Sequence, residues 1–215
     1  MNLLVLQLAD SAFPTGGFVH SGGLEAAARL GLVGDLHGWL RDSLEQAGHG
    51  ALPLATAGHA ADELAECDAV ADAWLSNHIA NRASRAQGQG WIATAAAVFP
   101  LPPLIELKRQ LRAGRLPGHL APAFGKVCAV LGLDLLAMQR LFLFLHLRGQ
   151  ISTAVRLGLA GPLEAQRLQA GFSADLEVVL ATCAAFGLDD LAATAPLQDL
   201  AHAHHDRLYS RLFAS

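Results

Sequence analysis

The chain has 215 residues, a formal net charge of −4 at pH 7, and a composition that is 53% hydrophobic and only 16% charged. This length is enough for one good core and short for two, so we expect a single domain over residues 1–215. The negative net charge provides no broad basic field that would attract nucleic acid. The apolar excess must be buried, either in a membrane or against protein.

Burial in a membrane is not expected from the sequence. A spanning helix needs about 20 mostly apolar residues, whereas the apolar run 141–147 contains His146 and is bounded by Arg140 and Arg148. A second uncharged run, 91–105, is broken by three prolines. The N-terminus lacks the basic start of a secretory signal. We therefore expect a cytoplasmic protein whose apolar excess is covered in an oligomer, with a homodimer as the simplest form.

The chain reads as a succession of helices. Ala and Leu dominate, and Ile, Val and Thr are scarce, which favours helices over strands. A short apolar helix from Leu3 to Leu8 comes first. Glycines and prolines then divide the chain into segments of helical length, near 21–30, 36–47, 52–65, 67–83, 91–98, 103–113, 121–131, 133–157, 162–186 and 197–212. The segment 133–148 is apolar on nearly every face, as in the central helix of a bundle. The pattern predicts an all-α bundle of about ten helices.

The loop after the first helix contains several residues that restrict or require particular backbone angles. Its sequence from Asp10 to Glu25 is DSAFPTGGFVHSGGLE. Proline fixes φ, and paired glycines permit backbone angles closed to other residues. The loop contains no phosphate-binding motif. Ser21 is a plausible cap for the helix that starts near Leu24. We predict a rigid, shaped loop whose structural residues are Asp10, Ser11, Pro14, Gly16, Gly17, His20 and Ser21.

Two groups, His20 and the segment 82–91, allow more than one interpretation. His20 could be a metal ligand or a proton shuttle, but a satisfied histidine that holds the loop is the favoured interpretation. Glu25 and Arg29 are four residues apart and are most simply a surface ion pair. The segment 82–91 carries two arginines among amides and glycines. It could bind an anion, and we interpret it as a solvated loop.

The strongest metal candidates lie near the C-terminus, and they are His202, His204 and His205 with Asp199 and Asp206. On one helix, Asp199, His202 and Asp206 would share a face that could hold nickel or zinc. The alternative is a solvated helix whose apolar face is Leu200, Leu208 and Leu212, and we favour it because isolated histidines are unspecific. We expect no stably bound cofactor.

The remaining candidates for chemistry are weak. Cys67, Cys128 and Cys183 are far apart in apolar surroundings and are expected to be buried thiols of a reducing compartment. No general base is identifiable beside any of three serines considered as nucleophiles, Ser11, Ser21 and Ser152.

The chain ends in an aromatic and apolar cluster, 209–213, where solvated residues are usual. Tyr, Arg and Phe are enriched at the centres of interfaces, so docking into a partner is favoured slightly over folding back.

The motif of the N-terminal loop resembles the signature of the UreF family of urease accessory proteins. Four further stretches agree with that family, in its order: NRASRAQGQGW at 81–91, GHLAPAFG at 118–125, STAVRL at 152–157 and YSRLF at 209–213. The resemblance therefore spans nearly the whole chain.

The resemblance implies a helical, homodimeric scaffold without catalysis of its own. Such a scaffold would join a UreD/UreH-type accessory protein and a UreG-type GTPase, and the complex would handle the nickel delivered to apo-urease. Glu25 and Arg156 match positions in the face that meets the GTPase, and the C-terminal partner-binding residues would be Tyr209, Arg211, Leu212 and Phe213. Ala214 departs from the family, whose SRLF motif is commonly followed by Arg or another residue before the final Ser. The alternative is an all-α protein with metal-binding, nickel-storing or hydrolytic activity of its own around His202, His204 and His205.

Overall fold

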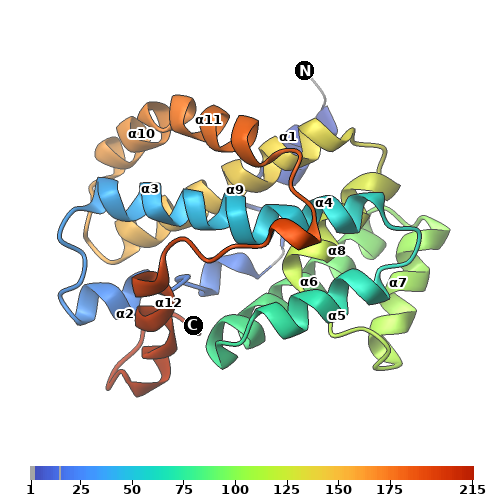
Figure 1. Cartoon of the computed structure of the whole chain (residues 1–215), viewed down its shortest axis with the longest axis horizontal. Coiled ribbons are helices and arrows are strands. Elements are labelled where there is room, and N and C mark those ends of the chain that lie inside the picture. Colours follow the sequence, from blue (N-terminus) through green and yellow to red (C-terminus); the bar gives the residue numbers. More distant parts are fainter. Residues whose placement is uncertain (1–2, 15) are drawn as a thin grey trace.

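The computed structural model describes residues 3–14 and 16–215, and every regular element over these residues is a helix (Figure 1). The predicted all-α fold is thus confirmed; Thr15, inside the predicted loop, lies outside the described residues. The α-helices are α1 (Leu3–Ala9), α2 (Leu24–Arg29), α3 (Leu36–Gln46), α4 (Leu52–Ala60), α5 (Ala65–Trp74), α6 (His78–Val98), α7 (Pro102–Arg112), α8 (Leu120–Val130), α9 (Leu135–Arg156), α10 (Pro162–Gly171), α11 (Ser173–Cys183) and α12 (Pro196–Ala203). Short 3₁₀ turns lie at Gly17–Val19, Leu188–Asp190 and His205–Arg207, and a π-helical turn at Ala47–Ala51 joins α3 to α4.

Helix α9 is central to the bundle, as its apolar sequence predicts. It packs against α3, α4, α8, α10 and α11, and also contacts α1 and α2 (Figure 1). Leu143 and Leu147 are almost fully buried, whereas Leu135 and Leu136 in the first turn remain partly exposed. The apolar surface of α9 is therefore covered by neighbouring helices along most of its length.

The core is organised around stacked aromatic rings and a close approach of two helices. Trp91 stacks on Phe124 with ring centroids 4.8 Å apart, and Phe13 meets Trp91 edge to face at 5.4 Å. Helices α4 and α8 touch through glycines: a Cβ at Gly125 would lie 1.9 Å from the Ala55 carbonyl oxygen. The GHLAPAFG stretch is therefore a packing motif, because only glycine allows this approach.

The glycines at 88–90 do not end a helix, so the solvated loop predicted at 82–91 is wrong. Helix α6 runs straight through this segment. Gly88 faces the backbone of the α7–α8 connection, and a Cβ there would lie 2.3 Å from the Gly118 carbonyl oxygen. The true break comes earlier, where the Asn77 side chain accepts hydrogen bonds from the Ile79 and Ala80 N–H groups and starts α6.

Three other predicted helices are shorter than expected, and the first of them, 52–65, ends at Ala60. The segment 162–186 is divided at Phe172, which is fully buried and separates α10 from α11. The segment 197–212 is helical only to Ala203, and after one 3₁₀ turn the chain is irregular to its end. Helix starts at Pro102, Pro162 and Pro196 agree with the sequence to within one residue, because proline fits the first turn.

The three cysteines are free and buried, as expected. Burial raises the pKa of the Cys128 thiol to about 12 and that of Cys183 to about 11, so both are inert at neutral pH. Among the described residues, none of the helices combines the length and apolar character needed to cross a membrane.

Candidate partner-binding site

The N-terminal loop and the C-terminal tail, far apart in sequence, are held together by hydrogen bonds. The N–H and hydroxyl of Ser21 both donate to the Ser215 carbonyl oxygen, at 2.6 and 2.8 Å. The Ala214 N–H donates to the Val19 carbonyl oxygen at 2.7 Å. His20 Nδ1 lies 2.6 Å from the Ser215 hydroxyl, a contact that suits a loop-holding histidine. Ser21 therefore holds the tail in place by two hydrogen bonds. The prediction that the Ser21 side chain caps α2 is wrong.

Glu25 is the buried centre of this junction. Its carboxylate accepts hydrogen bonds from the Leu212 N–H at 2.6 Å and the Phe213 N–H at 3.1 Å, and it lies 3.1 Å from His205 Nε2. Glu25 and His205 are both fully buried. The predicted surface ion pair with Arg29 is therefore wrong: the carboxylate binds the tail, because a buried charge needs several donors.

Arg156, at the end of α9, joins the loop to the tail through aromatic stacking. Its guanidinium lies 3.8 Å from the centroid of the Phe18 ring and 4.0 Å from that of Phe213, so it sits between the two rings. It also donates to the Phe18 carbonyl oxygen. An arginine between two aromatic faces is held by cation–π attraction as well as by hydrogen bonding.

Gly22 and Gly23 are required for two reasons: their backbone φ angles are positive, and neighbouring atoms leave no space for a Cβ. Both have positive φ, at 59° and 88°. A Cβ at Gly22 would lie 2.3 Å from Gln150 Nε2, and one at Gly23 would lie 3.0 Å from the His202 Cβ. The loop can therefore lie flat against α9 and α12 only with glycine at both positions.

The histidines near the C-terminus do not converge on a ligand set. His205 pairs with Glu25, His204 Nδ1 lies 2.8 Å from the Leu200 carbonyl oxygen, and His202 packs under Gly23. Asp206 accepts two hydrogen bonds from Arg82, at 3.0 and 3.1 Å. Within the described part of the chain, no group of three or more His, Cys, Asp or Glu side chains could hold a metal ion.

The surroundings of His202 and His20 lower the pKa of both imidazoles and so favour their neutral forms. Burial, with smaller contributions from His205, His20 and Arg82, lowers the pKa of His202 to about 4. Burial likewise lowers the pKa of His20. The alternative interpretation of this segment also needs correction, since its supposed apolar face includes Leu200 and Leu212, which are 58% and 52% exposed.

The first half of the loop is tied to α6. The Asp10 carboxylate accepts the Ala12 N–H at 2.8 Å, and the Thr94 hydroxyl donates to the Pro14 carbonyl oxygen at 2.7 Å. Ser11 and Gly16 are exposed, and Gly16 has a φ of 77°. Gly17 begins the 3₁₀ turn that presents Phe18. Behind the loop lies a cavity of about 530 Å³, bordered by its backbone and by the aromatic core.

The C-terminal tail is divided between the core and the surface. Phe213 and Ser215 are only 5% and 1% exposed, so the tail folds back on its own chain, the possibility that the sequence favoured less. Tyr209 projects fully into solvent, and Arg211 stays at the surface, where it pairs with Asp206 at 2.9 Å. Six large apolar side chains of the loop, of α12 and of the tail remain at least 45% exposed, namely Phe18, Val19, Leu197, Leu200, Tyr209 and Leu212.

A second polar cluster, at the start of α8, has a structural role. His119 lies 3.2 Å from the Ser84 hydroxyl and 3.1 Å from the Asp72 carboxylate, an order found in nucleophilic sites. The Ser84 oxygen, however, already accepts a hydrogen bond from the Leu120 N–H. Arg85 forms an ion pair with Asp72 and lowers the pKa of the Asp72 carboxyl. The cluster therefore satisfies buried polar groups where α6 meets α8. The serines considered from sequence, Ser11 and Ser152, are exposed.

Sequence reasoning singled out the loop, Glu25, Arg156 and the tail separately, and the structure brings them together. It missed Arg82 and the role of His205, and it gave Phe18 no role. These contacts join residues more than 120 positions apart, so no local pattern reveals them. The only available signal was that Phe18 and Arg156 both lie in stretches that resemble one family.

Comparison with known proteins agrees with that resemblance. A family model described as UreF matches residues 32–173. Urease accessory protein F of Oryza sativa subsp. indica is 34% identical over 217 residues, covering 97% of this chain and 83% of the relative. The Arabidopsis thaliana protein of that name is 35% identical, covering 97% and 90%. Urease accessory protein UreF of Arthrobacter sp. (strain FB24) is 31% identical over 220 residues, covering 99% and 96%. With a family model over residues 32–173 and relatives that match nearly the whole chain, the chain belongs to the UreF family of urease accessory proteins.

Proposed function

We propose that this accessory protein is a non-catalytic scaffold for urease maturation in the cytoplasm. It binds a UreD/UreH-type accessory protein and a UreG-type GTPase, and the assembly delivers nickel to apo-urease. The scaffold is a homodimer, and nickel is cargo of the complex without a resident site in this chain.

The observation that carries this proposal is the construction of the loop–tail junction. The junction is held rigid by the buried Glu25 carboxylate, by Arg156 between two rings and by the hydrogen-bonded tail. The side chains exposed around it are aromatic and aliphatic. Exposed apolar residues on a rigid support are typical of protein-binding sites, because little conformational entropy is lost when the partner binds. A nickel-storing or hydrolytic role for His202, His204 and His205 has less support, since these side chains contact different groups.

The test is co-expression of this chain with the UreD/UreH-type and UreG-type proteins, followed by size-exclusion chromatography. We expect all three proteins in one peak. Phe18→Ala should weaken the complex about ten-fold, because exposed aromatic residues are frequent hot spots. Leu163→Ala is the matched control, since Leu163 is 76% exposed on α10, outside the junction. Equal effects of the two substitutions, or GTP hydrolysis by this chain alone, would contradict the proposal.

A further inference from the structure

We infer that the outer face of α7 is a second docking surface, which binds an acidic amphipathic helix of another protein. We call it the α7 face, made of Val98, Leu101, Ile105, Lys108 and Arg112. Figure 1 places α7 on the opposite side of the molecule from α2 and α12, so this surface is separate from the loop–tail junction. The inference does not depend on the proposed function.

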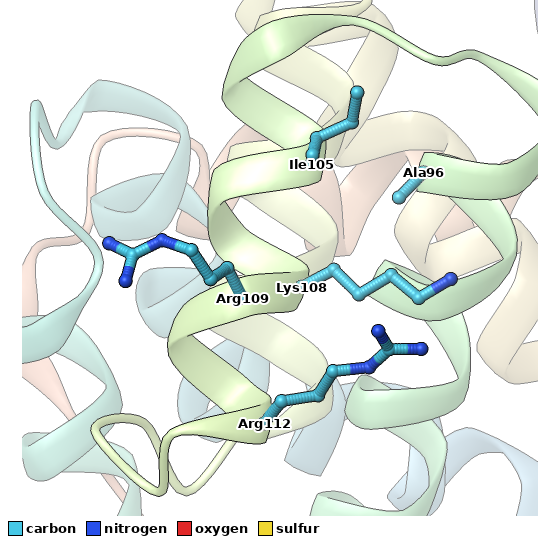
Figure 2. Close-up of a pocket in the computed structure, with 5 residues that line it drawn as sticks. All are labelled: Ala96, Ile105, Lys108, Arg109 and Arg112. Atoms are coloured by element: carbon cyan, nitrogen blue, oxygen red, sulfur yellow. The ribbon is translucent and has the colours of Figure 1, made fainter.

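Helix α7 carries a buried pair of leucines and, beside it, a partly exposed stripe. Leu104 and Leu107 are 0% and 5% exposed and pack into the core. The positions 101, 105, 108 and 112 recur at intervals of three or four, so they form one stripe, which runs beside the buried leucines on the edge of α7 that faces α6 (Figure 2). Ile105 is 51% exposed within this stripe. The α7 face is therefore apolar at one end and cationic at the other, with Val98, Leu101 and Ile105 each at least 40% exposed.

The cationic end is not neutralised by the protein. Figure 2 shows Lys108 and Arg112 extending from α7 toward the same side, beside Ala96 of α6, whereas Arg109 points the other way. Arg109 is paired with Glu106 at 2.6 Å, but neither Lys108 nor Arg112 has an ion-pair partner among the described residues. Together with Ala96, Ile105 and Arg109, they line a shallow pocket of about 370 Å³. Two neighbouring cations without a counter-charge favour an anionic ligand.

The charge of this segment is opposite to that of the molecule. Residues 105–115 carry four basic side chains and one acidic one, whereas the whole chain has a net charge of −4. The partner must therefore be acidic where it meets Lys108 and Arg112. A nucleic acid would satisfy this charge but would gain nothing from the exposed Val98, Leu101 and Ile105. A helix with aliphatic residues on one turn and carboxylates on the next matches both ends of the face.

The length of the stripe defines the partner segment. Leu101 and Arg112 are eleven residues apart, which is about 16 Å along a helix at 1.5 Å per residue. The partner helix therefore needs about three turns in contact, with Leu or Ile facing Ile105 and Glu or Asp facing the two cations. Small side chains on α6, such as Ala96 and Ala97, leave room for close approach beside α7.

The test uses a fluorescein-labelled helical peptide with leucines in its first two turns and glutamates in its last two, titrated with the full chain. We expect saturable binding that weakens as salt is added. Lys108→Glu with Arg112→Glu should lower the affinity at least ten-fold. Arg29→Glu with Arg167→Glu, which changes net charge equally on α2 and α10, should leave the affinity unchanged. Ile105→Ala should lower it about three-fold without any change in charge.

Three results would overturn the inference. A peptide of the same composition with scrambled positions should not bind, so equal binding would indicate a non-specific apolar or charged contact. Loss of binding in the control double variant would show that only net charge matters. Displacement of the peptide by an equally tight oligothymidine strand would identify a phosphate-binding surface. Circular dichroism of each variant establishes that it is folded.

Discussion

At the scale of single residues, one carboxylate connects the two ends of the chain. Glu25 accepts two backbone N–H groups of the tail and pairs with the imidazole of His205, and Glu25 and His205 are both fully buried. Removing the carboxylate would leave two donors and a histidine buried without partners. Each buried polar group left unsatisfied costs about 1–3 kcal/mol, so this contact is a main stabiliser of the junction.

We therefore expect Glu25→Ala to lower the free energy of unfolding by about 3–5 kcal/mol. Glu25→Gln, which keeps an acceptor oxygen, should lose less. Arg29→Ala is the matched control, because a surface residue of α2 should change stability by no more than about 0.5 kcal/mol. Urea denaturation of the three variants gives these values. Similar small losses for Glu25→Ala and Arg29→Ala would instead indicate an exposed helical ion pair.

Two buried imidazoles make stability depend on pH. Burial lowers the pKa of His146 and of His202 from 6.5 to about 4. The unfolded chain therefore binds more protons than the folded one below pH 6.5, so the stability is complete above pH 6.5 and is lost as the pH falls toward 4. We expect a loss of up to about 3 kcal/mol for each imidazole over this range.

The measurement is urea unfolding at pH 7 and at pH 5, a range in which most carboxylates stay ionised in the unfolded chain. His202→Asn should reduce the difference between the two pH values. His204→Asn, at a partly exposed position of the same segment, is the control and should leave the difference unchanged. A difference unaffected by either substitution would contradict the assignment to His202.

At the scale of helices, the sequence was informative where proline begins an element and misleading where glycine packs against another backbone. Pro162 lies in a first turn, as predicted, and so do Pro102 and Pro196, which the sequence placed just before their helices. Gly88, by contrast, looks like a break in the sequence but allows a close contact with another backbone, as Gly125 does inside a helix that was predicted. Local propensity cannot distinguish these roles, since the reason for the glycine lies in a distant segment.

Substitution by alanine separates the two roles of glycine. Gly149→Ala in α9 should stabilise the fold by about 0.5–1 kcal/mol, because a Cβ there meets nothing within 4 Å. Gly88→Ala has the same gain in helix propensity, yet it should destabilise by about 1–3 kcal/mol because the Cβ would clash with the Gly118 carbonyl. Thermal unfolding of both variants provides the comparison. Stabilisation by Gly88→Ala would show that α6 and the α7–α8 connection are less tightly packed.

The tail supports a paired prediction, because its aromatic residues have different surroundings. Phe213→Ala should lower the free energy of unfolding by about 3–4 kcal/mol, as for other buried phenylalanines. Tyr209→Ala should leave stability within about 0.5 kcal/mol, since Tyr209 is fully exposed. Co-purification with the UreD/UreH-type protein should instead fail with Tyr209→Ala. A complex that survives Tyr209→Ala, with stability intact, would remove the outer face of the tail from the interface.

At the scale of the whole molecule, composition was enough to predict the fold class but not the site. Abundant Ala and Leu, with few β-branched residues, can bury an apolar surface only as packed helices. The junction depends on contacts such as Ser21 with Ser215, which appear only when the ends of the bundle meet. Glu25 and Arg29 satisfied a helical spacing rule, yet the tertiary fold turned the carboxylate inward.

Exposed apolar side chains on the whole molecule predict that the chain assembles with itself. Although the core buries many of the hydrophobic residues, large apolar side chains remain exposed on α1, on the α7 face and at the junction, among them Leu3, Ile105 and Tyr209. A net charge of −4 on 215 residues gives only weak repulsion between copies. We therefore expect light scattering at micromolar concentration to give the mass of a homodimer. A dimer that covers an apolar surface should persist in high salt, whereas one held by charge should dissociate. A strict monomer at all salt concentrations would show that these surfaces are kept for other proteins.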